Sequence, residues 1–466
     1  MEKLDYQELG FKSGLEIHQQ LDSHKLFCNC PSLLRKDEPD FEIKRKLHAV
    51  AGESGKVDEA ADYEAGLGKE IIYQGFDTTC LVELDEEPPH LINQEALKIA
   101  LQISLLLNAK ILPISQIMRK TVINGSNTSG FQRTVMIARD GFVETSQGRV
   151  GIEAIFLEED AARTVSKMKD KAVFRIDRLG IPLVEIMTRP DIKSAEQAKE
   201  TALKIGEILR ACKVKRGIGT IRQDINISIK DGNRVELKGF QDPKIMIETI
   251  DNEIKRQLSF AEKENPSEVR NVLQDGTSEF LRPMPGAARM YVETDVPNVR
   301  IKPFLKGLGK VELISDKTKN LEEKGISADL ARELVKNKID INDYKYKDLN
   351  FVARVLIEMP KEIDSRLNLD SKKLKKSDFD EVLKKYFRNE ISKEAVFEIL
   401  VEKVKGNKVN YSKYKVVSGD DLEKEIKEII KKHKGVPINA LMGIVMGKYR
   451  GKVDGKKVME ILKKNV

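Results

Sequence analysis

The spacing of apolar residues divides the chain into a part that mixes strands with helices and a part that contains helices only. At 221–229, isoleucines alternate with polar residues, among them Arg222, Asp224 and Asn226, which predicts a half-buried strand with one polar face. A second segment, at 183–187, is predicted to be a mostly buried strand that carries a single acid, Glu185. After about residue 303 the apolar residues follow helical spacing and the strand alternation ends.

Capping patterns locate two helices in the first part. Asn93 precedes an apolar run, and Ser194 with Gln197 has the spacing of a capping box that opens a helix reaching to about Cys212. We therefore expect an α+β fold with three domains. These are a mixed α/β body at 1–305, an all-α helical domain at 306–407 and a small helical tail domain at 408–466.

The composition is that of a globular protein, with 40% apolar and 34% charged residues. No stretch of about 18 uncharged apolar residues occurs, so we expect no membrane span, and the N-terminal residues lack the apolar core of a secretion signal. Four cysteines in 466 residues exclude a disulfide scaffold and fit a reducing compartment. The expected location is the cytoplasm.

Positive charge is concentrated toward the C-terminal end. Residues 301–466 contain 39 Lys and Arg against 27 Asp and Glu, whereas the first 300 residues contain 43 against 48. From Lys408 onward the numbers are 15 and 7. Such asymmetry indicates that one end meets a polyanion, and the alternative is a lysine-rich solvated surface.

Three segments that carry acids are candidates for chemistry. Because side chains alternate along a strand, Glu16 and His18 share one face and together can hold a metal or a proton; the alternative is a polar surface edge. The three consecutive acids Glu158, Glu159 and Asp160 cannot all be buried without partners, and Mg²⁺ would relieve their repulsion. The alternative for these three is a solvated turn. Glu185, inside its apolar strand, also needs a partner, such as a metal, an arginine or a backbone donor.

The segment 124–133 has two glycines among small and hydroxyl-bearing residues, with Arg119, Lys120 and Arg133 beside it. Backbone N–H groups of such a loop can bind phosphates, although it does not end in the Gly-Lys-Ser/Thr of a Walker A sequence. The alternative is an ordinary wide hairpin loop.

The cysteines form half of a metal site at most. Cys28 and Cys30 are close in sequence, Cys80 is the only other cysteine in this region, and Cys212 is expected in the core. A structural zinc needs four ligands, so we expect no zinc here unless a histidine completes the set.

Taken together, these segments resemble the GatB/GatE family of tRNA-dependent amidotransferase subunits, and within it the archaeal GatE branch more than the bacterial GatB branch. The resemblance runs in order through nearly all of the first 300 residues and continues, more weakly, at 439–462. The segments that carry it are GLEIHQQLDSHKLFCNCPS at 14–32, TTCLVELDEEPPH at 78–90, RKTVINGSNTSGFQRT at 119–134, LEEDAA at 157–162, RLGIPLVEIMTRPDI at 178–192, GTIRQDINISI at 219–229, VELKGFQ at 235–241 and LRPMPGAARMYVETDVP at 281–297.

The resemblance implies a cradle-shaped catalytic body, a helical domain and a tRNA-binding tail. It implies a ligase that uses ATP and Mg²⁺ to phosphorylate the γ-carboxylate of glutamate misacylated on tRNA(Gln). Ammonia from a glutaminase, the asparaginase-like GatD, then displaces the phosphate to give glutaminyl-tRNA(Gln). The family also implies a homodimer within a heterotetramer.

The resemblance assigns roles to residues of this sequence. Glu16, His18, Glu159 and Glu185 match the family's metal-site positions and would bind Mg²⁺. The remaining candidates would contact ATP phosphates or the acyl end of the substrate: Ser126, Asn127, Thr128, Ser129, Gly130, Arg133, Arg222, Asp224, Asn226 and Lys238.

Two departures from the family limit what carries over. The large domain that GatE proteins usually insert before the LRPMPGAARMY segment is absent, since only about twenty residues, near 261–279, occupy that place. A second cysteine pair, present in the zinc knuckle of bacterial GatB, is also missing. Two other functions stay open at this point. One is a noncatalytic adaptor that binds tRNA, and the other is a bacterial GatB-type protein that also acts on Asp-tRNA(Asn).

Overall fold

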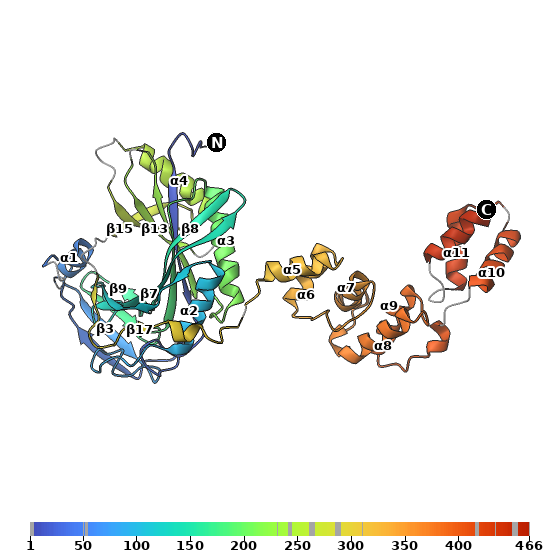
Figure 1. Cartoon of the computed structure of the whole chain (residues 1–466), viewed down its shortest axis with the longest axis horizontal. Coiled ribbons are helices and arrows are strands. Elements are labelled where there is room, and N and C mark those ends of the chain that lie inside the picture. The colour runs from blue at the N-terminus through green and yellow to red at the C-terminus, as the bar shows by residue number, and fades with distance from the viewer. Residues whose placement is uncertain are drawn as a thin grey trace. The chain divides into compact units, whose positions relative to one another are not determined.

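The structure, a computed structural model, describes residues 4–465 except 50, 52–54, 231, 241–244, 261–265, 285–289, 310, 415–418, 434 and 450–454. The segment 285–289, part of the 281–297 motif, therefore lies outside the described residues. The chain divides into two compact units, Met1–Leu313 and Ile314–Val466. Figure 1 shows strands in the first unit and helices in the second.

The first unit contains the strands and four α-helices of the described chain. Their bounds are β1 Lys12–Gln20, β2 Phe41–Arg45, α1 Glu59–Gly66, β3 Glu70–Gly75, α2 Gln94–Leu106, β4 Lys110–Ile111, β5 Ile114–Ser115, β6 Ile117–Thr121, β7 Phe131–Thr145, β8 Gly148–Glu159, β9 Arg163–Lys167, β10 Lys171–Arg175, β11 Pro182–Thr188, α3 Ala195–Ala211, β12 Ile221–Ser228, β13 Val235–Phe240, α4 Met246–Leu258, β14 Glu268–Val272, β15 Ser278–Pro283, β16 Met290–Val292 and β17 Val299–Arg300.

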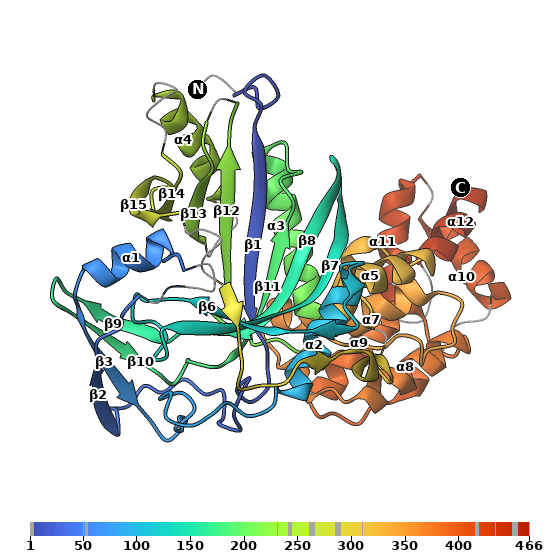
Figure 2. The same ribbon diagram turned by 60° about the vertical axis from the view of Figure 1, so that its left-hand side comes forward.

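Most of the strands form one large sheet. Its order is β15-β14-β13-β12-β1-β11-β8-β7-β6-β16, with β4 paired to β7, and its pairs are antiparallel except β13 with β14. A smaller sheet has the order β2-β3-β10-β9. Figure 2 shows β1 passing through the middle of the large sheet, between β12 on one side and β11 on the other.

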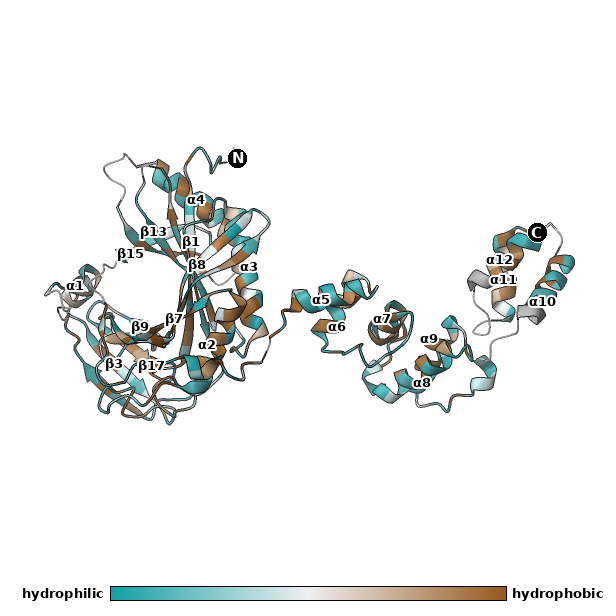
Figure 3. Cartoon of the chain, viewed as in Figure 1, coloured by the Kyte–Doolittle hydropathy of each residue, from teal (hydrophilic) through white to brown (hydrophobic). Residues whose placement is uncertain are grey.

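One face of the large sheet is covered and apolar. Leu15 and Ile17 of β1 belong to a core that also contains buried residues of α2, α3 and α4. The predicted caps are present, because the Ser194 side chain accepts from the backbone N–H of Gln197 and Asn93 caps α2. In Figure 3, α3 and α4 carry both hydrophobic and hydrophilic residues. This is typical of amphipathic helices that pack one face against a sheet. The opposite face of the sheet is therefore free to carry polar residues.

The second unit is helical over its described residues. Its α-helices are α5 Ile314–Glu323, α6 Ala328–Lys336, α7 Leu349–Leu367, α8 Lys376–Phe387, α9 Lys393–Val404, α10 Gly419–Lys432, α11 Ile438–Lys448 and α12 Gly455–Asn465. Together the two units confirm the α+β class. None of the helices, within the part of the chain that the structure describes, is long and apolar enough to cross a membrane.

Two separate hydrophobic cores occur in the second unit. One joins buried residues between Ile326 and Val404, and the other joins residues between Leu422 and Leu462. Tyr411 still packs against the first core, a few residues past the boundary expected at 407/408. The division into three domains stays a prediction.

Candidate functional site

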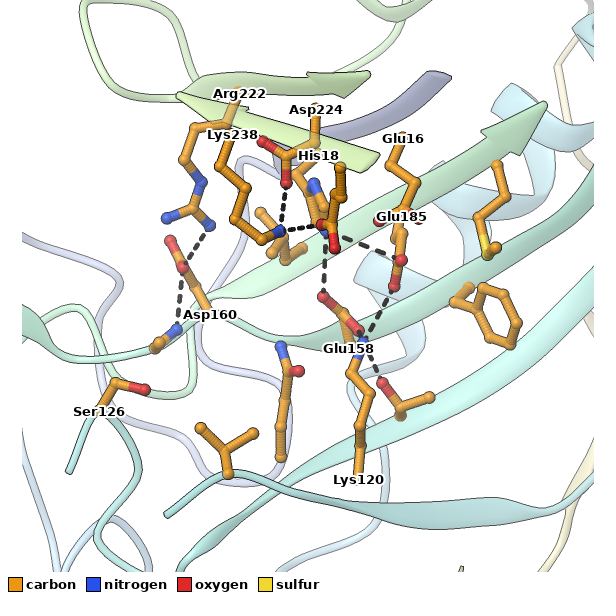
Figure 4. Close-up of a pocket in the computed structure, with 18 of the residues that line it drawn as sticks. Glu16, His18, Lys120, Ser126, Glu158, Asp160, Glu185, Arg222, Asp224 and Lys238 are labelled. Atoms are coloured by element: carbon orange, nitrogen blue, oxygen red, sulfur yellow. Dashed lines mark hydrogen bonds and ion pairs between the residues drawn. The ribbon is translucent and has the colours of Figure 1, made fainter. Parts of the chain in front are cut away.

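The polar face of the large sheet carries a pocket of about 600 Å³. Side chains of β1, β8, β11, β12 and β13 line it, and residues of β6, β7 and the loop between them contribute as well. The labelled residues in Figure 4 converge on this space from neighbouring strands.

Strand register brings the pocket residues together. On one side of β1, His18 lies opposite Glu185 of β11. On the other side, His18 lies opposite Arg222 and Glu16 opposite Asp224, both on β12. Because directly opposed residues of an antiparallel pair point to the same face, these five side chains form one polar surface.

A first cluster consists of His18, Glu158 and Glu185, whose ligand-capable atoms lie within 4.8 Å of one another. The Nε2 atom of His18 is 3.8 Å from Oε1 of each glutamate. The ammonium group of Lys120 contacts the other oxygen of each, at 3.0 Å from Oε2 of Glu158 and 3.3 Å from Oε2 of Glu185. Thr134 also donates to Oε2 of Glu158, at 2.7 Å. Lys120 thus holds both carboxylates so that one oxygen of each faces His18.

The environment fixes the charges of this cluster. Burial lowers the pKa of His18 to about 4, so its imidazole is neutral near pH 7 and has a lone pair available for a ligand. Burial and the neighbouring Glu185 raise the pKa of Glu158. Burial would also raise the pKa of Glu185, but Lys120 and the hydrogen bond with Glu158 outweigh it and lower that pKa. Two close carboxylates in one buried site favour a bound cation.

A second cluster lies beside the first and contains Glu16, Asp224 and Glu236. Lys238 binds both Asp224, at 2.7 Å from Oδ2, and Glu236. Asn226 donates to Oε1 of Glu16 at 3.2 Å. Burial, followed by the charge of Glu236, raises the pKa of Glu16 to about 7.

The sequence expectations agree in large part with this pocket. Seven of the predicted residues line it from the strands, and two more line it from the loop between β6 and β7. They are Glu16, His18, Glu185, Arg222, Asp224, Asn226 and Lys238, together with Ser126 and Asn127. Their placement is observed, and their roles stay predictions.

Glu159 does not lie with His18 and Glu185, contrary to the expected four-residue metal set. It follows Glu158 on β8 and therefore points to the other face, where Oε2 accepts from the backbone N–H of Arg133 at 3.2 Å. Glu158 occupies the position expected for Glu159.

Four residues expected to bind phosphate also lie outside the pocket lining: Thr128, Ser129, Gly130 and Arg133. The guanidinium of Arg133 is bound by Glu293, with Nε 2.8 Å from Oε2, and Glu159 is a second ion-pair partner. The hydroxyl of Thr128 donates to the carbonyl of Glu83, and that of Ser129 donates to the carbonyl of Phe131. The predicted residues 126–130 lie in the loop of the β6–β7 hairpin. Of these, only Ser126 and Asn127 line the pocket.

Sequence reasoning named Asp160 among three consecutive acids and Lys120 beside the loop, but gave neither a role, and it did not name Glu236. Of the first two acids it chose Glu159 over Glu158. Strand alternation could have indicated the acids. Residues two apart share a face, so Glu158 and Asp160 lie opposite to Glu159, and Glu236 shares a face with Lys238. For Lys120 no signal in the sequence indicates which acids it meets.

A third group of ligand-capable side chains lies away from the pocket. The side chains of Cys28, Cys30, Cys80 and Glu83 come within 4.8 Å of one another. Among the described residues, the carboxylate of Glu83 is the fourth side chain of this group, in the place where sequence reasoning asked for a histidine. Glu83 already accepts from the Cys28 thiol at 2.8 Å and lies 3.2 Å from the ammonium of buried Lys25. The expectation of no zinc stays a prediction, whereas Cys212 lies in the core as expected.

Comparison with known proteins extends over the whole chain. A family model described as the GatB/GatE catalytic domain matches residues 11–306, and one described as the GatB domain matches residues 312–466. Three relatives each carry the name of the E subunit of glutamyl-tRNA(Gln) amidotransferase. The protein of Methanocaldococcus jannaschii is 37% identical over 627 aligned positions, which cover 100% of this chain and 99% of the relative.

The relatives of Methanosarcina barkeri and Saccharolobus solfataricus are each 34% identical to this chain. The alignment with the first covers 100% of this chain and 99% of the relative, and the alignment with the second covers 99% of each. The aligned positions outnumber the 466 residues of the chain, so these relatives contain a long stretch without a counterpart here. That agrees with the absence of the inserted domain. On the match of both family models and of these full-length relatives, the chain belongs to the GatB/GatE family.

Proposed function

We propose that this chain is the component of a tRNA-dependent amidotransferase that converts Glu-tRNA(Gln) to Gln-tRNA(Gln). The observation that carries the proposal is the pocket itself, with two acidic clusters, each bound by a lysine, on one sheet face. The names of the full-length relatives point to the same substrate. This reaction forms a carbon–nitrogen bond, so the chain is a ligase. Because its substrate is a tRNA used in translation, the proposed location is the cytoplasm.

The reaction has two balanced steps. In the first, an oxygen of the glutamyl γ-carboxylate bonds to the γ-phosphorus of ATP, and the bond from that phosphorus to the bridging oxygen of ADP breaks. In the second, ammonia bonds to the acyl carbon, inorganic phosphate leaves with the acyl oxygen, and the nitrogen loses a proton. The first step brings two anions together, and the second develops negative charge on the departing phosphate, so both need positioned positive charge.

The donor set of the first cluster fits a hard divalent cation. His18, Glu158 and Glu185 would hold Mg²⁺, with Glu16 in the adjacent second cluster. Carboxylate oxygens are the protein ligands that Mg²⁺ prefers. When bound, Mg²⁺ neutralises phosphate charge next to the substrate carboxylate. Lys120 keeps Oε1 of both glutamates directed at this point, and Arg222 and Lys238 supply further positive charge to the phosphates and to the γ-carboxylate.

The chemistry requires a source of ammonia, and the family resemblance implies which partners provide it. Ammonia has to be supplied, and the family supplies it through a separate glutaminase, which for GatE proteins is GatD. A homodimer of this chain within a heterotetramer, and tRNA(Gln) bound through the basic second unit, complete the proposed assembly. A noncatalytic adaptor is the alternative function, but an adaptor has no use for the buried carboxylate cluster of the pocket.

The direct test supplies the purified full chain with Glu-tRNA(Gln), ATP, Mg²⁺ and ammonium, without a partner. Formation of Gln-tRNA(Gln), measured after digestion of the tRNA and separation of the aminoacyl-adenosines, is the expected result. Binding of tRNA without product or ATP hydrolysis would contradict the proposal and favour the adaptor. Equal conversion of Asp-tRNA(Asn) would instead indicate the broader substrate range of a bacterial GatB protein.

Cation binding is expected to depend on pH. Burial raises the pKa of Glu16 to about 7 in the cation-free protein, so protons compete with the cation below that pH. Between pH 7 and pH 6 the apparent affinity for Mn²⁺, measured by electron paramagnetic resonance titration, should fall about fivefold. Above pH 7.5 it should be nearly constant.

Two variants control the pH experiment. Glu16→Gln should bind Mn²⁺ more weakly at every pH and lose most of the dependence near pH 7. Glu153→Gln, on the exposed side of β8, should behave like the unsubstituted chain. An unchanged pH dependence in Glu16→Gln would show that another group titrates.

A further inference from the structure

Asp160 is a buried acid at the end of the pocket that neither cluster uses. It follows β8 directly, and it is 1% exposed. Its Oδ1 accepts from Nη2 of Arg222 at 2.8 Å and from the backbone N–H of Ala161 at 2.8 Å, and its Oδ2 accepts from Nε2 of Gln20 at 2.6 Å. Figure 4 shows the Asp160 carboxylate directed at the Arg222 guanidinium.

These contacts join three separate parts of the fold. Gln20 is the last residue of β1, Arg222 is on β12, and the turn after β8 is held by Arg178, whose guanidinium donates to the carbonyls of Ala161 and Ala162 at 2.7 and 2.9 Å. Nε of Arg178 also lies 3.7 Å from Oδ2 of Asp160. The carboxylate is therefore fixed from several directions, and it can fix Arg222 in turn.

The electrostatics support a permanent ion pair. Burial alone would raise the pKa of Asp160, but the charges of Arg222 and Arg178 outweigh it and lower that pKa. The Asp160 charge in turn raises the pKa of Arg222. Both groups are charged near pH 7, and the side chain of Arg222 is 34% exposed on the pocket side.

We propose that Asp160 is a positioning residue that aims the Arg222 guanidinium at the phosphate chain of the bound nucleotide. The proposal rests on the proposed function, since it assumes that a nucleotide occupies this pocket. Arg222 lies opposite His18 across the β1–β12 pair, and its charge acts on His18 and Glu158 of the first cluster. An arginine held in one orientation loses less conformational entropy when it binds phosphate than one that is free to turn.

The test is a double-mutant cycle in the full chain. Asp160→Asn keeps the size of the side chain and removes its charge, and it should raise the KM for ATP about tenfold with little change in kcat. In an Arg222→Gln background the same substitution should change the KM by less than about twofold, because Asp160 then has no guanidinium to orient. The affinity for a non-hydrolysable ATP analogue with Mg²⁺ should follow the KM.

A matched control separates positioning from stability. Glu253→Gln removes another buried acid that binds an arginine, Arg256 on α4, away from the pocket. It should lower the melting temperature without changing the KM for ATP. If Asp160→Asn does not fold, Gln20→Leu provides the second variant, with a smaller rise of the KM in the same direction.

Two results would overturn the proposal. One is an unchanged analogue affinity and KM in a folded Asp160→Asn chain, and the other is an equal effect of this substitution with and without Arg222. Failure of the proposed function has a different signature, since the unsubstituted chain would then form no Gln-tRNA(Gln). The analogue affinities still decide the role of Asp160 in that case, and an unsubstituted chain that binds no analogue overturns both proposals.

Discussion

Glu158→Gln is expected to lower ATP-dependent formation of Gln-tRNA(Gln) by about 100-fold or more, whereas Glu159→Gln should keep most of the activity. The two residues are neighbours on β8, but their side chains point to opposite faces of the sheet. Glu158 lies with His18 and Glu185, so its charge contributes to cation binding. Glu159 contacts Arg133, which keeps its bond to Glu293 when Glu159 is replaced.

The measurement compares initial rates with Glu-tRNA(Gln), ATP, Mg²⁺ and ammonium, so that no glutaminase is needed. Melting temperature and tRNA affinity are recorded for both variants to separate loss of chemistry from loss of fold. Mn²⁺ affinity should fall in Glu158→Gln only. If Glu159→Gln is the inactive variant and Glu158→Gln keeps its rate, the assignment made from the sequence is right and the assignment made from the pocket geometry is wrong.

Removal of residues 415–466 is expected to weaken tRNA binding about tenfold or more at 0.1 M salt. The deleted segment contains 13 Lys and Arg against 7 Asp and Glu, and RNA affinity depends strongly on such charge. The cut follows Tyr414 because that residue and Tyr411 pack against the preceding helical core, which should therefore stay folded. Equilibrium binding of tRNA(Gln) as a function of salt measures both the affinity and the number of phosphates contacted.

Two observations check this experiment. The truncated chain should show a smaller slope of log affinity against log salt, since fewer counterions are released. Its Mn²⁺ affinity should match that of the full chain, because the pocket lies wholly within the first unit. An unchanged tRNA affinity and slope would place the RNA contacts elsewhere and would leave the lysine-rich end as a solvated surface.

Strand periodicity explains why much of the pocket was predictable. The alternation of Arg222, Asp224 and Asn226 with isoleucines fixes their common face, and the same rule joins Glu16 to His18. At Glu158, Glu159 and Asp160 three acids are consecutive, so acidity alone does not show which of them faces the pocket. Family resemblance selected Glu159, and strand geometry selects Glu158.

The sequence by itself determined the class of the fold, the family, the change from mixed to helical structure and most of the polar strand face. These features depend on local patterns, such as period, caps and long motifs, which are present in the order of the residues. Only the tertiary structure decided that Lys120 joins Glu158 to Glu185, that Arg133 binds Glu293, and that Glu83 lies with the cysteines. Such contacts link residues far apart in the chain, and they depend on strand order and register, which no local pattern specifies.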